Sequence, residues 1–254
     1  MPRTFLFVLV CSVFAASVSD ADAQVGQPWT DRGYFNFNVG FEGTSGTLTD
    51  ATTFTLYDES GTKNVQHAVD SGSLIDLSFG GRVWRNVSIG LGFHRGSTSG
   101  EAAVTGAVPN PLFFNRPRNV ALSASGLDRT EQALHLQFGY MLLINDRLDV
   151  HLFIGPSFFN LKQEVVSDVS ITEQAFPFTN VNADAAVTER EDSATGANVG
   201  ADVSYKVYET ANMILRAGMF LRYTGASGKV TVLASERDSD VGGLQVGFGA
   251  RVRF

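Results

Sequence analysis

Apolar and polar residues alternate one by one at the end of the chain. Within residues 242–254, every second position from Leu244 to Phe254 is apolar, and the positions between them are mostly arginine or glycine. Successive side chains of a strand point to opposite faces of its sheet, so this segment predicts a strand with one apolar face. An unpaired edge on such a strand would promote aggregation, so both of its sides are expected to be paired. Closing the sheet into a barrel pairs both sides.

Seven other segments alternate in the same way, and together they predict eight strands. The eight segments are residues 34–42, 73–83, 87–94, 129–142, 148–155, 197–206, 213–222 and 242–254. Pro156, at the end of the fifth segment, predicts a bulge or the end of regular pairing there.

Short and long connections alternate strictly between these segments. The short connections are residues 84–86, 145–147 and 209–212, and the long ones are 43–72, 97–128, 165–192 and 225–240. This alternation predicts an all-β, eight-stranded, antiparallel up-and-down transmembrane barrel with short periplasmic turns and long extracellular loops. Strand-like stretches inside the loops, residues 53–57, 65–69 and 229–233, are expected to continue the hairpins rather than to add strands to the barrel.

Three features indicate that the apolar face points outward, into lipid. The polar face is rich in glycine, which leaves room for large side chains in a narrow lumen. The apolar face carries no charge in the middle of any segment, where Arg or Lys would cost about 2–4 kcal/mol at the bilayer midplane. Aromatic residues gather at the short-turn rim, as in an interfacial girdle: Tyr34, Trp84, Tyr205, Tyr208 and Phe254. The alternative is a soluble lipocalin-like carrier, with the apolar face turned inward.

The first 23 residues have the pattern of a secretory signal peptide. Arg3 precedes an apolar run over residues 5–16, and residues 21–23 give a small-x-small cleavage site. The barrel domain is therefore expected to comprise residues 24–254. Cys11 lies in the removed segment, so disulfides, cysteine-ligated metals and thiol catalysis are excluded. The net charge of −7, without a basic cluster, argues against a nucleic-acid partner.

These features resemble small bacterial outer-membrane barrels of the OmpA transmembrane-domain and OmpX type. The C-terminal series resembles the signal that such proteins present to the barrel-assembly machinery: Val246, Phe248, Ala250, Val252 and Phe254. The resemblance implies export to the outer membrane of a Gram-negative-type bacterium, contact with lipid and lipopolysaccharide, a monomeric state and no cofactor. It does not imply peptidoglycan binding, because the periplasmic domain of full-length OmpA has no counterpart here.

Ten charged residues are predicted to form a network in the lumen. They are Glu42, Asp76, Arg82, Asp149, Asp202, Lys206, Arg216, Arg222, Arg251 and Arg253. Buried charges persist only when they are paired, and eight strands leave little width for water. We therefore expect a packed ion-pair plug, with a narrow passage for small or hydrophobic solutes as the alternative.

The four histidines, His67, His94, His135 and His151, show no metal-ligand spacing and are expected to be ordinary buried or loop residues. Lipid-modifying outer-membrane enzymes place their catalytic groups on the lipid-facing surface, whereas His94 falls on the polar face. The long loops are mostly acidic and polar, with apolar groups at residues 109–114 and 176–178. The sequence thus favours a non-enzymatic protein that contributes to membrane integrity or to surface interaction.

Overall fold

Eleven strands occur in the part of the chain that the computed structural model describes, residues 29–43, 46–233 and 235–254. They are β1 (Gly33–Gly43), β2 (Gly46–Leu56), β3 (Glu59–Val69), β4 (Gly72–Trp84), β5 (Val87–Val108), β6 (Arg118–Leu143), β7 (Leu148–Glu173), β8 (Val181–Glu209), β9 (Ile214–Val232), β10 (Ser235–Val241) and β11 (Leu244–Arg253). No helix among these residues is long and apolar enough to cross a membrane. The expected signal peptide lies outside the described residues.

Eight of the strands close into an antiparallel ring. Its order is β1, β4, β5, β6, β7, β8, β9 and β11, and β11 pairs again with β1. The closing ladder runs from Tyr34 opposite Arg253 to Gly43 opposite Leu244. The C-terminal strand is thus paired on both sides, as its two-faced pattern requires. The predicted eight-stranded up-and-down barrel is confirmed.

Large apolar side chains are exposed on the outside of this ring, and we call them the apolar belt. The belt includes Phe35, Phe37, Val39, Ile75, Phe79, Ile89, Leu91, Phe93, Leu134, Phe138, Ile154, Val203, Met219, Leu221, Val246 and Phe248. Most charged and amide side chains of the ring point inward and are buried, whereas Arg82 and Arg95 are exposed. A monomer in water rarely exposes so large a continuous apolar surface, whereas a barrel in lipid requires it.

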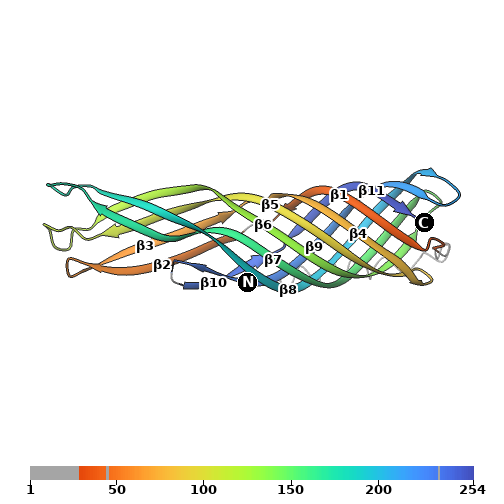
Figure 1. Cartoon of the computed structure of the whole chain (residues 1–254), viewed down its shortest axis with the longest axis horizontal. Helices are drawn as coiled ribbons and strands as arrows, with labels where there is room; N and C mark the ends of the chain where they lie inside the picture. The colour runs from red at the N-terminus through yellow and green to blue at the C-terminus, as the bar shows by residue number, and fades with distance from the viewer. Residues whose placement is uncertain (1–28, 44–45, 234) are drawn as a thin grey trace, which may run out of the picture.

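The strands continue past the ring into a second β-structure, which we call the extension. β5 to β9 run on without a break, and the β2–β3 hairpin pairs with β5 while β10 pairs with β9. Figure 1 shows the ring at the end of the molecule that carries the C-terminus and three long hairpins reaching the opposite end. β10 also lies against β2, but no ladder joins these two strands within the described residues.

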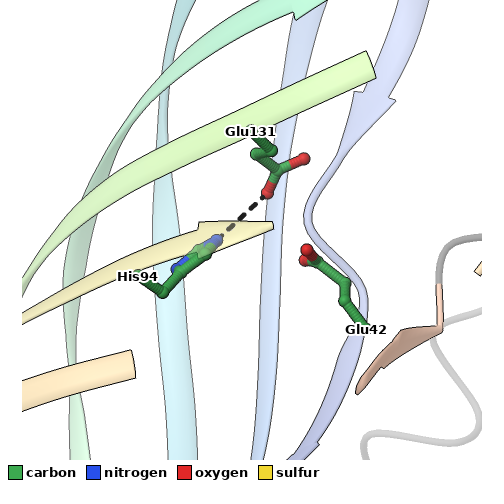
Figure 2. A group of neighbouring side chains, drawn as sticks. All are labelled: Glu42, His94 and Glu131. Carbon is green, nitrogen blue, oxygen red and sulfur yellow. Dashed lines mark ion pairs between the residues drawn. The ribbon is translucent and has the colours of Figure 1, made fainter. Parts of the chain in front are cut away.

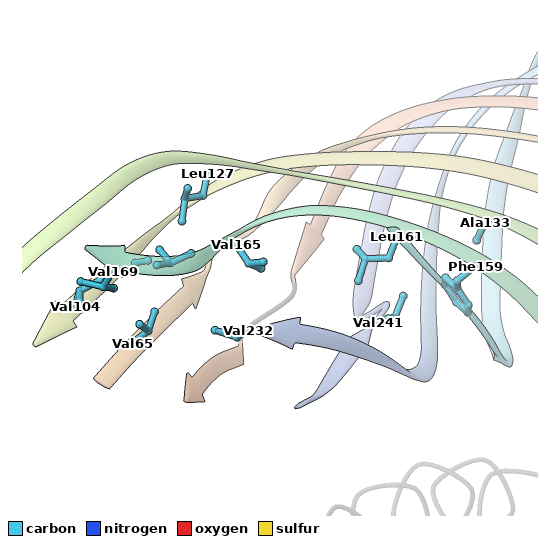
Figure 3. Close-up of a cluster of buried hydrophobic side chains, with 12 residues drawn as sticks. Val65, Val104, Leu127, Ala133, Phe159, Leu161, Val165, Val169, Val232 and Val241 are labelled. Carbon is cyan, nitrogen blue, oxygen red and sulfur yellow. The ribbon is translucent and has the colours of Figure 1, made fainter. Parts of the chain in front are cut away.

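The interior of the extension is apolar, in contrast to the lumen of the ring. Twelve buried side chains form its core: Val65, Ala102, Val104, Leu127, Ala133, Phe159, Leu161, Val165, Val166, Val169, Val232 and Val241 (Figure 3). Their packing holds the long hairpins together by burying apolar surface. The extension therefore has the construction of a water-soluble β-structure, apolar inside and polar outside.

Within the single strand β7, the outward face changes from apolar to polar and the inward face from polar to apolar. On its outward face, Ile154 and Phe158 are exposed, and the next outward residue is the polar Asn160. On its inward face, the buried Asp149 lies in the ring and the buried Leu161 lies in the extension. The strand keeps its alternation of two from Asp149 to Val165, so only the chemistry of each face changes at this boundary, and a bulge follows between Val166 and Asp168.

The long connections differ most from their expected form. The sequence predicts loops at residues 97–128 and 165–192, but most of these residues belong to the continuous ladders β5–β6 and β7–β8. Residues 53–57 and 65–69 fall largely in β2 and β3, which are separate strands outside the ring. The apolar inward positions of these segments account for the difference, because they bury one another once the hairpins pair.

One local expectation needs revision, and another is confirmed. Tyr34 does not belong to the rim girdle, because only 1% of its surface is exposed and its ring stacks edge-on against His151 inside the lumen. Trp84, Tyr205, Tyr208 and Phe254 are exposed as expected. At Pro156 regular pairing is interrupted as predicted, because the β6–β7 ladder is broken between the pairs His135–Ser157 and Phe138–Ile154. The strand itself continues to Glu173.

Replacing Phe79 by arginine tests whether the apolar belt faces lipid. Phe79 lies in the middle of the belt of β4 and is 56% exposed. We expect Phe79→Arg to lower the free energy of unfolding, measured by denaturant titration in lipid vesicles, by about 2–4 kcal/mol. Phe176→Arg is the matched control, because Phe176 is 76% exposed but lies at the tip between β7 and β8, outside the ring. Equal losses in the two variants would contradict a lipid-facing belt.

Candidate functional site

The charges in the lumen form two groups, of which the first lies near the short turns. Arg251 binds Asp202 through two contacts, from Nε to Oδ1 at 3.0 Å and from Nη2 to Oδ2 at 2.6 Å. Arg216 Nε lies 3.0 Å from Asp149 Oδ2. All four side chains are buried, so each pair compensates charges that water cannot reach.

Arg253 completes this first group in a different way. Its Nη2 lies 3.8 Å from Asp149 Oδ1, and its guanidinium carbon lies 5.2 Å from the centre of the Tyr34 ring. An arginine over an aromatic face is attracted by the ring's quadrupole. Glycine makes room nearby: a Cβ at Gly218 would lie 2.9 Å from Arg251 Nε. The packing therefore agrees with the expectation that lumen glycines accommodate arginines.

The second group lies farther along the lumen, toward the extension. Arg222 Nη1 lies 2.8 Å from Asp76 Oδ2, and Arg222 Nε donates to Gln245 Oε1 at 2.6 Å. Gln245 Nε2 donates in turn to Glu42 Oε1 at 2.7 Å. Gln245 thereby links an ion pair on one side of the lumen to a carboxylate on β1.

The structure places eight of the ten predicted network residues in the buried lumen and two at the rim. Arg82 is exposed beside a bulge of β4, and its Nη1 donates to the carbonyl of Trp29 at 2.7 Å. Lys206 pairs with Glu209 at 2.7 Å next to the bulge of β8. The five residues of the expected assembly signal alternate along β11 and its end, paired with β1 and β9.

Three of the four histidines lie in the lumen of the ring. His94 Nδ1 lies 2.7 Å from His135 Nε2, and His135 Nδ1 lies 2.7 Å from Ser157 Oγ. His151 Nε2 bonds separately to Ser88 Oγ at 2.9 Å. All three rings and both hydroxyls are fully or almost fully buried. No lipid substrate outside the barrel reaches a serine in this position, so this arrangement does not support the lipid-modifying alternative.

His67 is buried in the extension, against β7. Its Nε2 accepts a long hydrogen bond from the backbone N–H of Val166 at 3.4 Å. Burial lowers the pKa of His67 below its ordinary value of 6.5, because an apolar surrounding disfavours the charged ring. A neutral ring fits its place next to the apolar core of the extension.

A cluster of Glu42, His94 and Glu131 stands at the junction of the ring and the extension. Figure 2 shows the three side chains converging, and one potential ligand atom from each lies within 4.8 Å of the other two. His94 Nε2 and Glu131 Oε1 are 3.6 Å apart. The sequence expectation did not include Glu131 or a metal site. The alternation places Glu131 on the same face as His135, but only the register of β1, β5 and β6 brings the three residues together.

The tips of the three long hairpins carry exposed aromatic and apolar residues, which we call the distal cap. The cap consists of Tyr57 on the first tip, Leu112, Phe113 and Phe114 on the second, and Phe176 on the third. Arg118 and Glu173 join the second and third hairpins by two hydrogen bonds of 2.6 Å, and Tyr57 Oη lies 3.4 Å from Glu173 Oε1. The tips are thus fixed to one another.

Comparisons with known proteins find likenesses in structure only. No family model and no curated sequence matches the chain. The solved structure of the outer-membrane protein OprG from Pseudomonas aeruginosa is similar, with 12% identity, 88% of this chain and 97% of that chain covered, and a TM-score of 0.43. Neisserial surface protein A matches with 15% identity, 87% and 97% coverage and a TM-score of 0.41. Ail of Yersinia pestis, in complex with the heparin analogue sucrose octasulfate, matches with 12% identity, 87% and 99% coverage and a TM-score of 0.34.

These proteins are small outer-membrane barrels, and the chain is similar to them. The hydrogen-bonded ring is complete within the described part of the chain itself.

Removing one partner of a buried lumen pair should destabilise the barrel strongly. Asp202→Asn leaves the buried Arg251 uncompensated, and we expect the free energy of unfolding in lipid vesicles to fall by about 3–5 kcal/mol. Asp202→Asn combined with Arg251→Met should lose less than the sum of the single losses, because the pair is removed together. Lys206→Met is the control and should cost about 1 kcal/mol or less, since its pair with Glu209 is partly exposed. Additive losses would show that the lumen pair is not coupled.

The contact between Arg118 and Glu173 predicts a response to acid at the distal cap. The hydrogen bonds from Arg118 lower the pKa of Glu173 below its ordinary value of 4.5. A carboxyl with a lowered pKa stabilises the folded state above its ordinary pKa and loses this contribution as the pH falls through the lowered value. We expect the hydrogen-exchange protection of the hairpin tips, corrected for intrinsic rates, to fall below about pH 4.5 in the wild type.

Glu173→Gln removes the titrating group of this contact. In this variant, the hairpin tips should have low hydrogen-exchange protection at neutral pH, and acid should change it little. Glu189→Gln, on the exposed face of β8, should behave like the wild type. A wild-type cap that keeps its protection down to pH 3 would contradict the role of this pair.

Proposed function

We propose that this protein is a monomeric, non-enzymatic barrel of a bacterial outer membrane that acts by surface recognition through its distal cap. The observation that carries the proposal is the rigid display of aromatic residues at the end of the extension. Leu112, Phe113, Phe114 and Phe176 are between 49% and 76% exposed, although the hairpins beneath them bury a common apolar core. Exposed apolar groups on a well-packed frame are typical of contact sites.

The frame lowers the cost of binding. A flexible loop loses conformational freedom when it binds, whereas a preorganised one has already lost it on folding. The bidentate contact of Arg118 with Glu173 and the β-ladders below it fix the tips before any partner arrives. Aromatic side chains add large contact area with few rotatable bonds. The cap therefore suits a partner with an apolar surface at its contact site.

The orientation in the membrane follows from the two ends of the barrel. Short turns face the periplasm and long hairpins face the exterior in barrels of this class, so the extension and its cap would stand outside the cell. The apolar belt would contact lipid, and the exposed acidic and basic side chains above it would meet lipopolysaccharide. During biogenesis, the alternating C-terminal strand would be presented to the barrel-assembly machinery.

Passage of solutes through the ring is the weaker candidate. Arg216, Arg222, Arg251 and Arg253 extend across the lumen, and each is at most 5% exposed. A pore would require these side chains to leave their carboxylate partners, at the cost of unpaired buried charges. The lumen thus supports a structural role for the network.

Adhesion of intact cells that produce the protein tests the proposed role. We expect the wild type to bind at least one surface in a panel of immobilised matrix proteins, glycans and mammalian cell membranes. The variant Phe113→Ser/Phe114→Ser/Phe176→Ser should lose about tenfold or more of this binding, since each lost aromatic anchor costs about 1 kcal/mol or more. The matched control, Thr188→Ala/Glu189→Ala/Arg190→Ala, changes three exposed residues on the wall of β8 and should bind normally.

Cell-surface amount and the shift between boiled and unboiled samples on a gel establish that each variant is folded. Normal adhesion of the aromatic variant, or equal loss in both variants, would rule out the distal cap as the contact site.

A further inference from the structure

The cluster of Glu42, His94 and Glu131 has the separations of a metal site rather than of a hydrogen-bonded triad. The 3.6 Å between His94 Nε2 and Glu131 Oε1 is too long for a hydrogen bond. Two ligands about 2.1 Å from a shared cation are about 3 to 4 Å apart. The Glu42 carboxylate lies within 4.8 Å of both atoms, so a small adjustment of flexible glutamate side chains would complete the set.

A buried oxygen without a hydrogen bond marks the centre of the cluster. Glu131 Oε1 is buried and has no hydrogen-bond partner, while Glu131 Oε2 accepts from the N–H of Gly242 at 3.1 Å and from Arg129 Nη2 at 3.4 Å. The exposures of Glu42, His94 and Glu131 are 4%, 0% and 3%. An unsatisfied carboxylate oxygen in such a place is costly, and a cation would satisfy it.

The charges around the cluster also favour a cation. Among the described residues, this part of the lumen holds three buried carboxylates and two guanidinium groups that contact them or their link. The carboxylates are Glu42, Glu131 and Asp76, and the guanidinium groups are those of Arg129 and Arg222. One carboxylate therefore has no full positive charge to balance it. Two buried carboxylates that face each other repel unless a proton or a cation lies between them.

His94 is held with the correct nitrogen toward the carboxylates. Its Nδ1 bonds to His135 Nε2, and His135 Nδ1 bonds to Ser157 Oγ, which also accepts from Asn198 Nδ2. If His135 donates to Ser157, its Nε2 accepts the proton of His94 Nδ1, and His94 Nε2 then carries the lone pair. This outer hydrogen bond orients the ring as outer-shell partners do in metal sites. Gln245 Nε2 donates one hydrogen to Glu42 at 2.7 Å and the other to this lone pair at 3.3 Å, and a cation would replace that longer bond.

A small cavity gives access to the two carboxylates. It is lined by Glu42, Gly72, Gly96, Ser97, Thr98, Arg129 and Glu131, at the point where β3 ends and β4 begins beside β5. A Cβ at Gly96 would lie 2.5 Å from Glu42 Oε2, so the missing side chain leaves room for this carboxylate. An ion could therefore enter beside β5 without opening the ring.

We propose that Glu42, His94 and Glu131 bind one divalent first-row transition-metal cation at the junction of the ring and the extension. One imidazole and two carboxylates suit Zn²⁺ and neighbouring ions of that row. The ligands come from β1, β5 and β6. The ion would therefore link the C-terminal end of β1 to two strands that continue into the extension. β1 leads into β2, which lacks a ladder to β10 within the described residues. The cation would thus brace the extension at its unpaired side.

Zinc binding to the purified, folded full-length barrel in detergent tests this site. After removal of metal with EDTA, Zn²⁺ is titrated in competition with a chromophoric chelator, and Co²⁺ is added separately to record its visible absorption. We expect one equivalent of Zn²⁺ to bind and Co²⁺ to give a spectrum of nitrogen and oxygen ligands. Zn²⁺ should also raise the unfolding temperature, because it binds only the folded state.

The stoichiometric site should disappear in His94→Gln and in Glu131→Gln, and His135→Ala should weaken Zn²⁺ binding by about 10–100-fold, as expected for an outer-shell partner. His151→Gln is the matched control, because His151 is equally buried in the lumen but bonds to Ser88. It should bind Zn²⁺ like the wild type. Folding of every variant is checked by the gel shift on boiling.

Two results would overturn the proposal, and neither depends on a variant that folds poorly. The first is a wild-type barrel that binds no stoichiometric Zn²⁺ or Co²⁺, which would mean that a proton alone balances the carboxylates. The second is a stoichiometric site that persists in His94→Gln and Glu131→Gln, which would place it in the acidic residues of the extension. Since adhesion by the distal cap is measured on different residues, failure of either proposal leaves the other intact.

Discussion

Charge compensation inside a closed ring is the constraint on which this structure depends. The outer face of the ring is apolar, so the polar side chains of eight strands must share one narrow interior. There Arg251 meets Asp202, Arg216 meets Asp149 and Arg222 meets Asp76. Breaking one pair would leave a buried charge that neither water nor a partner compensates. A buried pair therefore adds little net stability, but it strongly constrains the register of its strands. Each pair joins different strands, so the network also fixes which strands face each other across the lumen.

Beyond the ring the same strands are surrounded by water instead of lipid, so their outward faces must be polar and their inward faces apolar. Along β7 the inward residue changes from Asp149 in the ring to Leu161 in the extension, while the outward residue changes from Phe158 to Asn160. The backbone ladder passes through this boundary without a break on the β8 side, and the β6 side is interrupted near Pro156. A continuous ladder couples the two halves mechanically, so the distal cap rests on the membrane barrel without a flexible linker.

The sequence predicts the ring well because the information is local. A period of two with one wholly apolar face specifies each strand, and alternating short and long connections specify the order. The extension is larger than the sequence predicts because its apolar positions, such as Val104, Leu122 and Val169, stand among small and polar residues. They belong to hairpins that bury one another only after pairing. Tyr34 was misplaced for a related reason: an aromatic residue at a strand end fits a rim girdle equally well, and only the register brings it beside His151 and Arg253.

The pairing of side chains within the lumen could not be predicted from the sequence, because it depends on contacts between residues far apart along the chain. Glu42 and Glu131 are 89 positions apart, and the contact of Gln245 with Glu42 crosses 203 positions. A shift of one residue in any ladder would turn these side chains into lipid, so the cluster exists only in the observed register. Its place follows from the same boundary that divides the molecule. Above the cluster the interior is mostly apolar, and below it three arginines meet two aspartates. The carboxylate in excess therefore lies at the junction.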